Sequence, residues 1–130
     1  MKKQIYSKLM IVLLLTSCGL QKNLKERLFL AEDYKKVYFK KCLKHGFNES
    51  KAIIEILKQD NSTNSEFLHG IKGYRIIDSL AKLTAVEIKK DSIAINYPDS
   101  RGKRVFSKCL KGYNSIFLDS MARSTYKLKR

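Results

Sequence analysis

Five side chains in the sequence are of the types that carry out covalent or acid–base chemistry. They are the thiols of three cysteines and the imidazoles of two histidines: Cys18, Cys42, Cys109, His45 and His69. A cysteine hydrolase would need a free, activated thiolate beside an imidazole. Both histidines lie near predicted turns, and we interpret them as side chains on helix surfaces. The sequence also lacks a Gly-rich phosphate loop, a nucleophile elbow and a metal-ligand cluster, so we predict no enzyme activity, no cofactor and no metal.

The first cysteine follows a segment with the layout of a secretion signal. Lys2, Lys3 and Lys8 form a basic start, and residues 9–15 are apolar without interruption. Such a segment targets a protein for export and does not belong to a folded domain. It is far shorter than the ~20 residues that a membrane-spanning helix needs. The sequence therefore predicts export without a permanent transmembrane segment.

The apolar run ends in Leu15-Thr16-Ser17-Cys18, which resembles the lipobox of bacterial lipoproteins. The resemblance implies a diacylglycerol thioether on Cys18, cleavage directly before it, and acylation of the new amino group. Two or three acyl chains would make a stable membrane anchor. The alternative is an ordinary signal peptide with a cysteine near its cleavage site. Gly19 stands where an inner-membrane retention signal usually has Asp, which favours the outer membrane.

These features divide the chain into three parts. Residues 1–17 are a removed signal peptide, residues 18–23 a lipidated tether, and residues 24–130 one folded domain. Roughly 110 residues follow the cleavage site, which suits a single domain with a modest core. Cys42 and Cys109 then form an even number of cysteines in an oxidising compartment, which predicts a disulfide. Two buried free thiols are the alternative.

The charge of the chain is strongly positive. Three of the 27 basic residues lie in the signal, so 24 face 12 acidic residues and the remaining chain carries about +12. Such a surplus could suit nucleic acid, anionic lipid or an acidic protein. Nucleic acid is not expected as a partner, because no nucleic-acid-binding motif accompanies the charge and the predicted destination is the cell envelope.

The periodicity of the apolar residues predicts helices over most of the folded domain. A first helix covers residues 24–44 and ends at Gly46, and a short second helix begins after Asn48 or Ser50. The expected buried side of the second helix consists of Ala52, Ile53, Ile56 and Leu57. Residues 59–64 then form the clearest loop.

A third helix is predicted from Asn64 or Ser65 to Lys90, either unbroken or bent near Gly70 and Gly73. Its inward side chains are Leu68, Ile71, Tyr74, Ile76 or Ile77, Leu80 or Ala81, Thr84 or Ala85, and Ile88. Residues 92–96 are the only strand candidate, and residues 96–102 form a second loop because Pro98 excludes a helix there. A final helix over residues 103–126 is expected to bury Phe106, Cys109 or Leu110, Tyr113, Phe117, Leu118 and Met121.

These elements predict an all-α fold, a small bundle of four to five helices. Cys42 lies near the end of the first helix and Cys109 near the start of the last. A disulfide between them would join the first helix to the last, provided that the intervening helices bring the chain back.

The C-terminal part contains a pattern formed by Lys108, Cys109, Leu110, Tyr113, Ser115, Leu118 and Asp119. This pattern resembles the signature of the type VI secretion amidase immunity proteins, which runs Lys-Cys-Leu-Asp-x-Tyr-His-Ser into Leu-Asp. Asp33-Tyr34, Cys42-Leu43, Gly73-Tyr74, Tyr97 and Gly102 also follow the order of the family. Lys111, Gly112 and Asn114 differ from it, where the family has Asp, a larger residue and His.

The resemblance implies an all-helical, disulfide-containing periplasmic protein, often a homodimer, that occludes the catalytic cleft of a peptidoglycan-cleaving amidase. A loop and a helix supply the contacts in that family. The first candidate here is the loop of residues 96–103, with Tyr97, Asp99, Ser100 and Arg101; Tyr and Arg are enriched among interface hot spots. Asp60 and Asn61 in the loop of residues 59–64 are the second.

An alternative function is a basic envelope lipoprotein that binds anionic lipid or a cell-wall polymer. It would need its lysines concentrated on one side. The best candidates are Lys35, Lys36, Lys40, Lys41 and Lys44, which span most of the circumference of the first helix.

Overall fold

The computed structural model describes the backbone of residues 2–63, 66–90 and 104–128, and their side chains from Asn23 onwards except residues 66 and 67. In these ranges the chain is all-α, as predicted. The α-helices are α1 (Lys2–Gly46), α2 (Lys51–Gln59), α3 (Gly70–Lys90), α4 (Val105–Tyr113) and α5 (Ile116–Thr125), with a 3-10 turn, η1 (Glu66–His69), before α3. The strand candidate at residues 92–96 and the loop of residues 96–103 lie outside the described residues.

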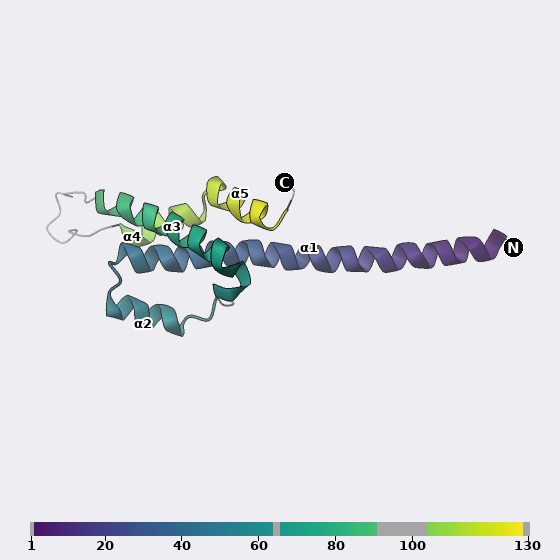
Figure 1. The fold of residues 1–130 in the computed structure, drawn as a ribbon, viewed down its shortest axis with the longest axis horizontal. Helices are drawn as coiled ribbons and strands as arrows, with labels where there is room; N and C mark the ends of the chain where they lie inside the picture. Colours follow the sequence, from purple (N-terminus) through teal and green to yellow (C-terminus); the bar gives the residue numbers. More distant parts are fainter. Residues whose placement is uncertain (1, 64–65, 91–103, 129–130) are drawn as a thin grey trace.

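The long helix α1 is the axis of the bundle. The helices α3, α4 and α5 pack against its C-terminal half, and α2 runs back along it after the turn that follows Gly46 (Figure 1). The N-terminal half of α1 projects beyond the bundle (Figure 1). This half contains the predicted signal peptide and Cys18, so the predicted anchor lies on the projecting part of the helix.

The core lies between α1 and the three helices that cover it. It contains few large side chains and several small ones, which let the helix axes approach closely. Its buried members are Ala31, Tyr34, Val37, Tyr38, Cys42, Ile77, Ala81, Ile88, Val105, Cys109, Leu118 and Ala122.

Cys42 and Cys109 form the predicted disulfide, so the alternative of two free thiols is wrong. The bridge joins α1 to α4 across a Cα–Cα distance of 5.6 Å, and both cysteines are fully buried. It closes a loop with a sequence separation of 67 residues. In the chain-entropy account, a loop of this size stabilises the fold by roughly 4 kcal/mol.

The predicted final helix is two helices, because Ser115 interrupts it. The Ser115 hydroxyl accepts a hydrogen bond from the Leu118 amide at 3.1 Å and donates to the Gly112 carbonyl at 2.7 Å. This N-cap starts a new helix and resets which residues face inward. The prediction that Phe106 and Phe117 are buried is wrong: they are 59% and 62% exposed. The new helix start accounts for Phe117, whereas Phe106 lies before it in α4.

The buried faces of α2 and the start of α3 also differ from the prediction. No residue of α2 is fully buried, and Ala52 and Ile56 are exposed. The chain bends at Gly70, one of the two predicted positions, where φ is +63°. The bend turns Leu68 and Ile71 outwards, so their predicted burial is wrong.

Gly112 lies where α4 comes closest to α1. A Cβ atom there would be 2.2 Å from the hydroxyl oxygen of Tyr38 and 3.0 Å from its Cζ atom. Tyr38 cannot move easily, because it is buried and its hydroxyl shares a 2.8 Å hydrogen bond with that of Thr84. Packing against α1 thus requires glycine at the position where the amidase immunity signature has a larger residue.

We predict that Gly112→Ala destabilises the fold, although alanine normally favours a helix by up to ~1 kcal/mol over glycine. The clash with Tyr38 should outweigh this gain and lower the free energy of unfolding by about 1–3 kcal/mol. Urea denaturation measures the effect. In a Tyr38→Phe background, which removes the nearest atom, the same change should cost about 1 kcal/mol less, as a double-mutant cycle would show. Equal costs in both backgrounds would contradict the clash.

Candidate functional site

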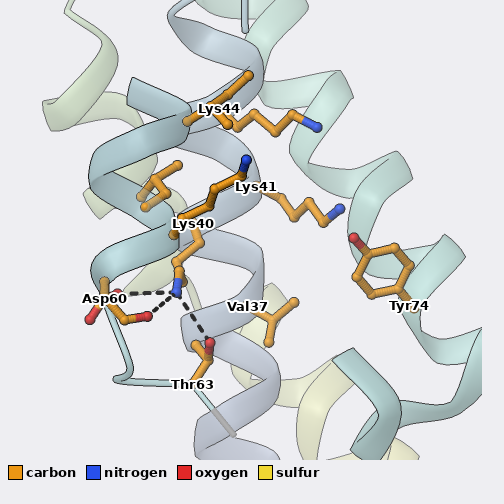
Figure 2. Close-up of a pocket in the computed structure, with 10 residues that line it drawn as sticks. Val37, Lys40, Lys41, Lys44, Asp60, Thr63 and Tyr74 are labelled. Atoms are coloured by element: carbon orange, nitrogen blue, oxygen red, sulfur yellow. Dashed lines mark hydrogen bonds and ion pairs between the residues drawn. The ribbon is translucent and has the colours of Figure 1, made fainter. Parts of the chain in front are cut away.

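A cleft lies between α1, α2 and α3, with a volume of about 510 Å³ (Figure 2). Four lysines and a group of apolar side chains line it. The lining residues are Val37, Lys40, Lys41, Lys44, Ile54, Leu57, Lys58, Asp60, Thr63 and Tyr74. Cationic side chains around an apolar floor form a site that suits a ligand with both a negative and an apolar part.

Lys40 closes one end of the cleft. Its ammonium donates to the Asp60 carbonyl at 2.7 Å and to the Thr63 hydroxyl at 3.3 Å, and it pairs with the Asp60 carboxylate at 3.3 Å (Figure 2). Hydrogen bonds from the side chain and amide of Ser62, together with Lys40, lower the pKa of Asp60. These contacts fasten residues 60–63, which belong to the predicted loop, to α1. Asp60 is thus occupied within the chain, while Asn61 beside it is exposed.

Lys41 and Lys44 lie one helical turn apart on α1, further along the cleft. The Lys41 ammonium lies 4.0 Å from the centre of the Tyr74 ring and 3.7 Å from the Asp78 carboxylate. Lys44 reaches the carboxylate of Glu49 only at 4.0 Å. Lys41 is therefore fixed against α3, whereas the ion pair of Lys44 is loose and partly exposed.

Three cationic or hydrogen-bond donor side chains contact the carboxylate of Asp78 on α3, beside the cleft. His45 lies at 2.8 Å, Lys82 at 2.7 Å and Lys41 at 3.7 Å from its oxygens. Burial alone would raise the pKa of Asp78, but the hydrogen bonds from Lys82 and His45 and the nearby charges outweigh it and lower the pKa to about 2. This ionised carboxylate connects α1 to α3.

The five lysines singled out on the first helix do not form one patch. Lys40, Lys41 and Lys44 line the cleft, whereas Lys35 pairs with Glu32 at 3.5 Å and with Asp119 of α5 at 3.7 Å. The side chain of Lys36 lies in a separate depression beside Phe39 and Tyr113.

Five of the seven residues of the amidase immunity signature lie where α4 and α5 join α1. Cys109 forms the disulfide, Ser115 caps α5, and Leu118 is buried. The Tyr113 hydroxyl donates a hydrogen bond to the Glu32 carboxylate, which raises the pKa of Tyr113 to about 12. Asp119 forms ion pairs with Lys35 and Arg123. Lys108 is half-buried and Leu110 is 41% exposed. Most of the signature therefore holds two helices in place.

The interpretation of the histidines as surface residues is wrong for His69. Its side chain is fully buried, with Nε2 at 3.0 Å from the Asp33 carboxylate and Nδ1 hydrogen-bonded to the Tyr126 hydroxyl. Burial, followed by the charges of Tyr34 and Asp33, raises the pKa of Tyr126 to about 12. His45 is also largely covered, between Asp78 and Glu49. Because both cysteines of the domain are in the disulfide, neither imidazole activates a thiol there.

The cluster of Asp33, His69 and Tyr126 could not be predicted from the sequence, for a geometric reason. The three residues come from α1, η1 and the C-terminal end of α5, and only the bend at Gly70 turns His69 inward. The sequence contains one weak indication that Asp33 is buried, because this residue lies on the same side of α1 as the apolar stripe. The cluster fixes the end of the chain to α1.

The remaining predicted site residues are not placed. Tyr97, Asp99, Ser100 and Arg101 lie outside the described residues, and at Cys18 only the helical backbone is described. Where side chains are described, no three His, Cys, Asp or Glu residues group as metal ligands. Within the described ranges, no helix is sufficiently long and apolar to cross a membrane.

The chain matches no family model, no curated protein and no solved structure.

We predict that Asp78→Asn lowers the free energy of unfolding by about 1–2 kcal/mol at pH 6. The pKa of Asp78 is lower in the folded state than in the unfolded chain. Its stabilising effect is therefore complete above about pH 4 and disappears as the pH falls towards 2. Urea denaturation of both proteins between pH 6 and pH 2 should show curves that converge on acidification. Glu55→Gln, an exposed carboxylate of α2, is the matched control and should change little. A difference for Asp78→Asn that is constant with pH would contradict the electrostatic origin.

Proposed function

We propose that this protein is a periplasmic lipoprotein that binds and blocks a peptidoglycan-cleaving amidase of a type VI secretion system. The observation that carries the proposal is the arrangement of the signature residues. They are not scattered over the fold: Cys109, Tyr113, Ser115, Leu118 and Asp119 all act at the joint of α4 and α5 with α1. A resemblance confined to one cooperating structural unit supports a shared architecture more strongly than isolated matches would.

The compartment supports the same proposal. A buried disulfide between Cys42 and Cys109 indicates an oxidising environment outside the cytoplasm. This agrees with the predicted signal peptide and lipidation at Cys18. A protein held in the periplasm is in the space where an incoming amidase would reach its peptidoglycan substrate.

The first candidate for the interface is the group Tyr97, Asp99, Ser100 and Arg101, which lies outside the described residues. Asp60 and Asn61 are the second candidate, although Asp60 is already paired with Lys40.

The anchor is tested by Cys18→Ala. We expect this variant to lose all incorporation of labelled fatty acid and to accumulate as an uncut or misprocessed precursor, because lipidation of the thiol precedes cleavage. Metabolic labelling and the electrophoretic size of the protein measure both effects. Normal cleavage of the variant, with no labelling of the wild type, would exclude a lipoprotein.

Amidase binding is tested with the loop variant Tyr97→Ala/Arg101→Ala. Loss of two hot-spot side chains should weaken binding by at least ~2 kcal/mol, about 30-fold, and abolish protection of cells that express a type VI amidase in the periplasm. Calorimetric titration and survival assays measure the two effects. The helical circular dichroism and melting temperature should stay near those of the wild type.

Arg75→Ala is the matched control, since Arg75 is an exposed arginine on α3. It should bind and protect as the wild type does. Full affinity of the loop variant would place the interface elsewhere. If the wild type binds no amidase of this class, the proposed function is wrong.

A further inference from the structure

The helix α2 leaves its apolar side incompletely covered. Ile53, Ile54 and Leu57 lie on one face of it, yet all three remain half-buried, and no residue of α2 is fully buried. Ile54 and Leu57 face the cleft instead of a packed core. An apolar ligand in the cleft would remove these side chains from water, which would lower the free energy of the complex.

The opposite wall of the cleft continues this apolar surface. Val37 of α1 is buried, and the ring of Tyr74 on α3 is half-buried under the ammonium of Lys41. Val37 and Lys44 lie seven residues apart on α1, which places the apolar part and the last lysine about 10 Å from each other along the helix. Lysines and apolar side chains therefore alternate along the cleft, with Lys40 and Lys41 between Val37 and Lys44 on α1.

Four lysines and the carboxylate of Asp60 line the cleft, while Asp78 and Glu49, outside the lining, pair with Lys41 and Lys44. Lys40 satisfies the carboxylate of Asp60 at one end of the cleft (Figure 2). Lys44 has only the loose contact with Glu49, and Lys58 is exposed and makes no ion pair with a described residue. Lys44 and Lys58 are thus the cations available to an anionic group, with Lys41 beside them.

We propose that the cleft between α1, α2 and α3 binds a single-chain anionic lipid. Its acyl chain lies among Val37, Ile54, Leu57 and Tyr74, and its charged head contacts Lys44 and Lys58. The volume of about 510 Å³ lies within the usual range of small-ligand sites, roughly 300–1,000 Å³. A hydrophilic polymer would leave the apolar floor exposed, so the lining favours an amphiphile. This inference does not rest on the proposed amidase binding.

The test uses the mature lipoprotein, purified from the envelope in a non-ionic detergent, and palmitate as the probe. Native mass spectrometry should show one palmitate per chain at saturation. Cetyl alcohol, which has the same chain without the charge, should bind at least tenfold more weakly. Inorganic phosphate alone should not compete, because it lacks the apolar part.

Two variants separate the head from the chain. Lys44→Gln/Lys58→Gln should raise the palmitate Kd at least tenfold, and Leu57→Ser should raise it severalfold. The matched control Lys25→Gln/Lys89→Gln removes two exposed lysines away from the cleft and should leave the Kd unchanged. Circular dichroism and the resistance of Cys42 and Cys109 to alkylation should confirm that every variant is folded.

The opposite results would overturn the proposal. One such result is the absence of palmitate binding. Another is the same palmitate Kd for Lys44→Gln/Lys58→Gln and for the control Lys25→Gln/Lys89→Gln, and a third is displacement of palmitate by phosphate alone. An acidic peptide that binds the cleft and excludes palmitate would assign the site to a protein partner instead. Because the assay contains no amidase, none of these results bears on the proposed function.

Discussion

The bridge between Cys42 and Cys109 is the constraint on which the C-terminal half of the structure depends. It holds α4 against the end of α1 at a Cα–Cα distance of 5.6 Å. At that separation Gly112 of α4 packs against Tyr38 of α1, and the hydroxyl of Tyr113 reaches Glu32, which is also in α1. A larger residue at position 112 would separate the two helices at the point where the bridge draws them together.

Electrostatic contacts set the position of α3 in a similar way. Asp78 is bound by His45 and Lys41 of α1, while the neighbouring core positions Ile77 and Ala81 are fully buried. Close packing of these small side chains permits few relative positions of the two helices. The directional hydrogen bond and ion pair of Asp78 favour the same register.

The domain has few large side chains in its core and leaves many large apolar side chains exposed. Those more than half exposed include Leu24, Ile56, Ile71, Leu83, Phe106, Ile116 and Phe117. Small domains have a high ratio of surface to volume, so a single disulfide contributes a large share of their stability. The core does not extend to α2, none of whose residues is fully buried, so this helix borders a cleft.

Features that depend on local order along the chain could be predicted from the sequence. Apolar periodicity predicted most of the helices, but not the break at Ser115. Glycine marked the end of α1 at Gly46 and, as one of two candidate positions, the bend at Gly70, and an even number of cysteines predicted the bridge. The signal peptide and the lipidation of Cys18 are also local patterns, and the structure leaves them as predictions.

Which side chains are buried depends on the tertiary structure. A helical stripe is several residues wide, and a single cap at Ser115 shifts it, so periodicity cannot choose between Phe117 and Leu118. His69 is buried because Asp33 of α1 and Tyr126 after α5 contact it, and both are far from it in the sequence. The cleft likewise unites lysines of α1 and α2 that are up to 18 positions apart in the sequence. Burial is a property of neighbours in space, and most of these neighbours are far apart along the chain.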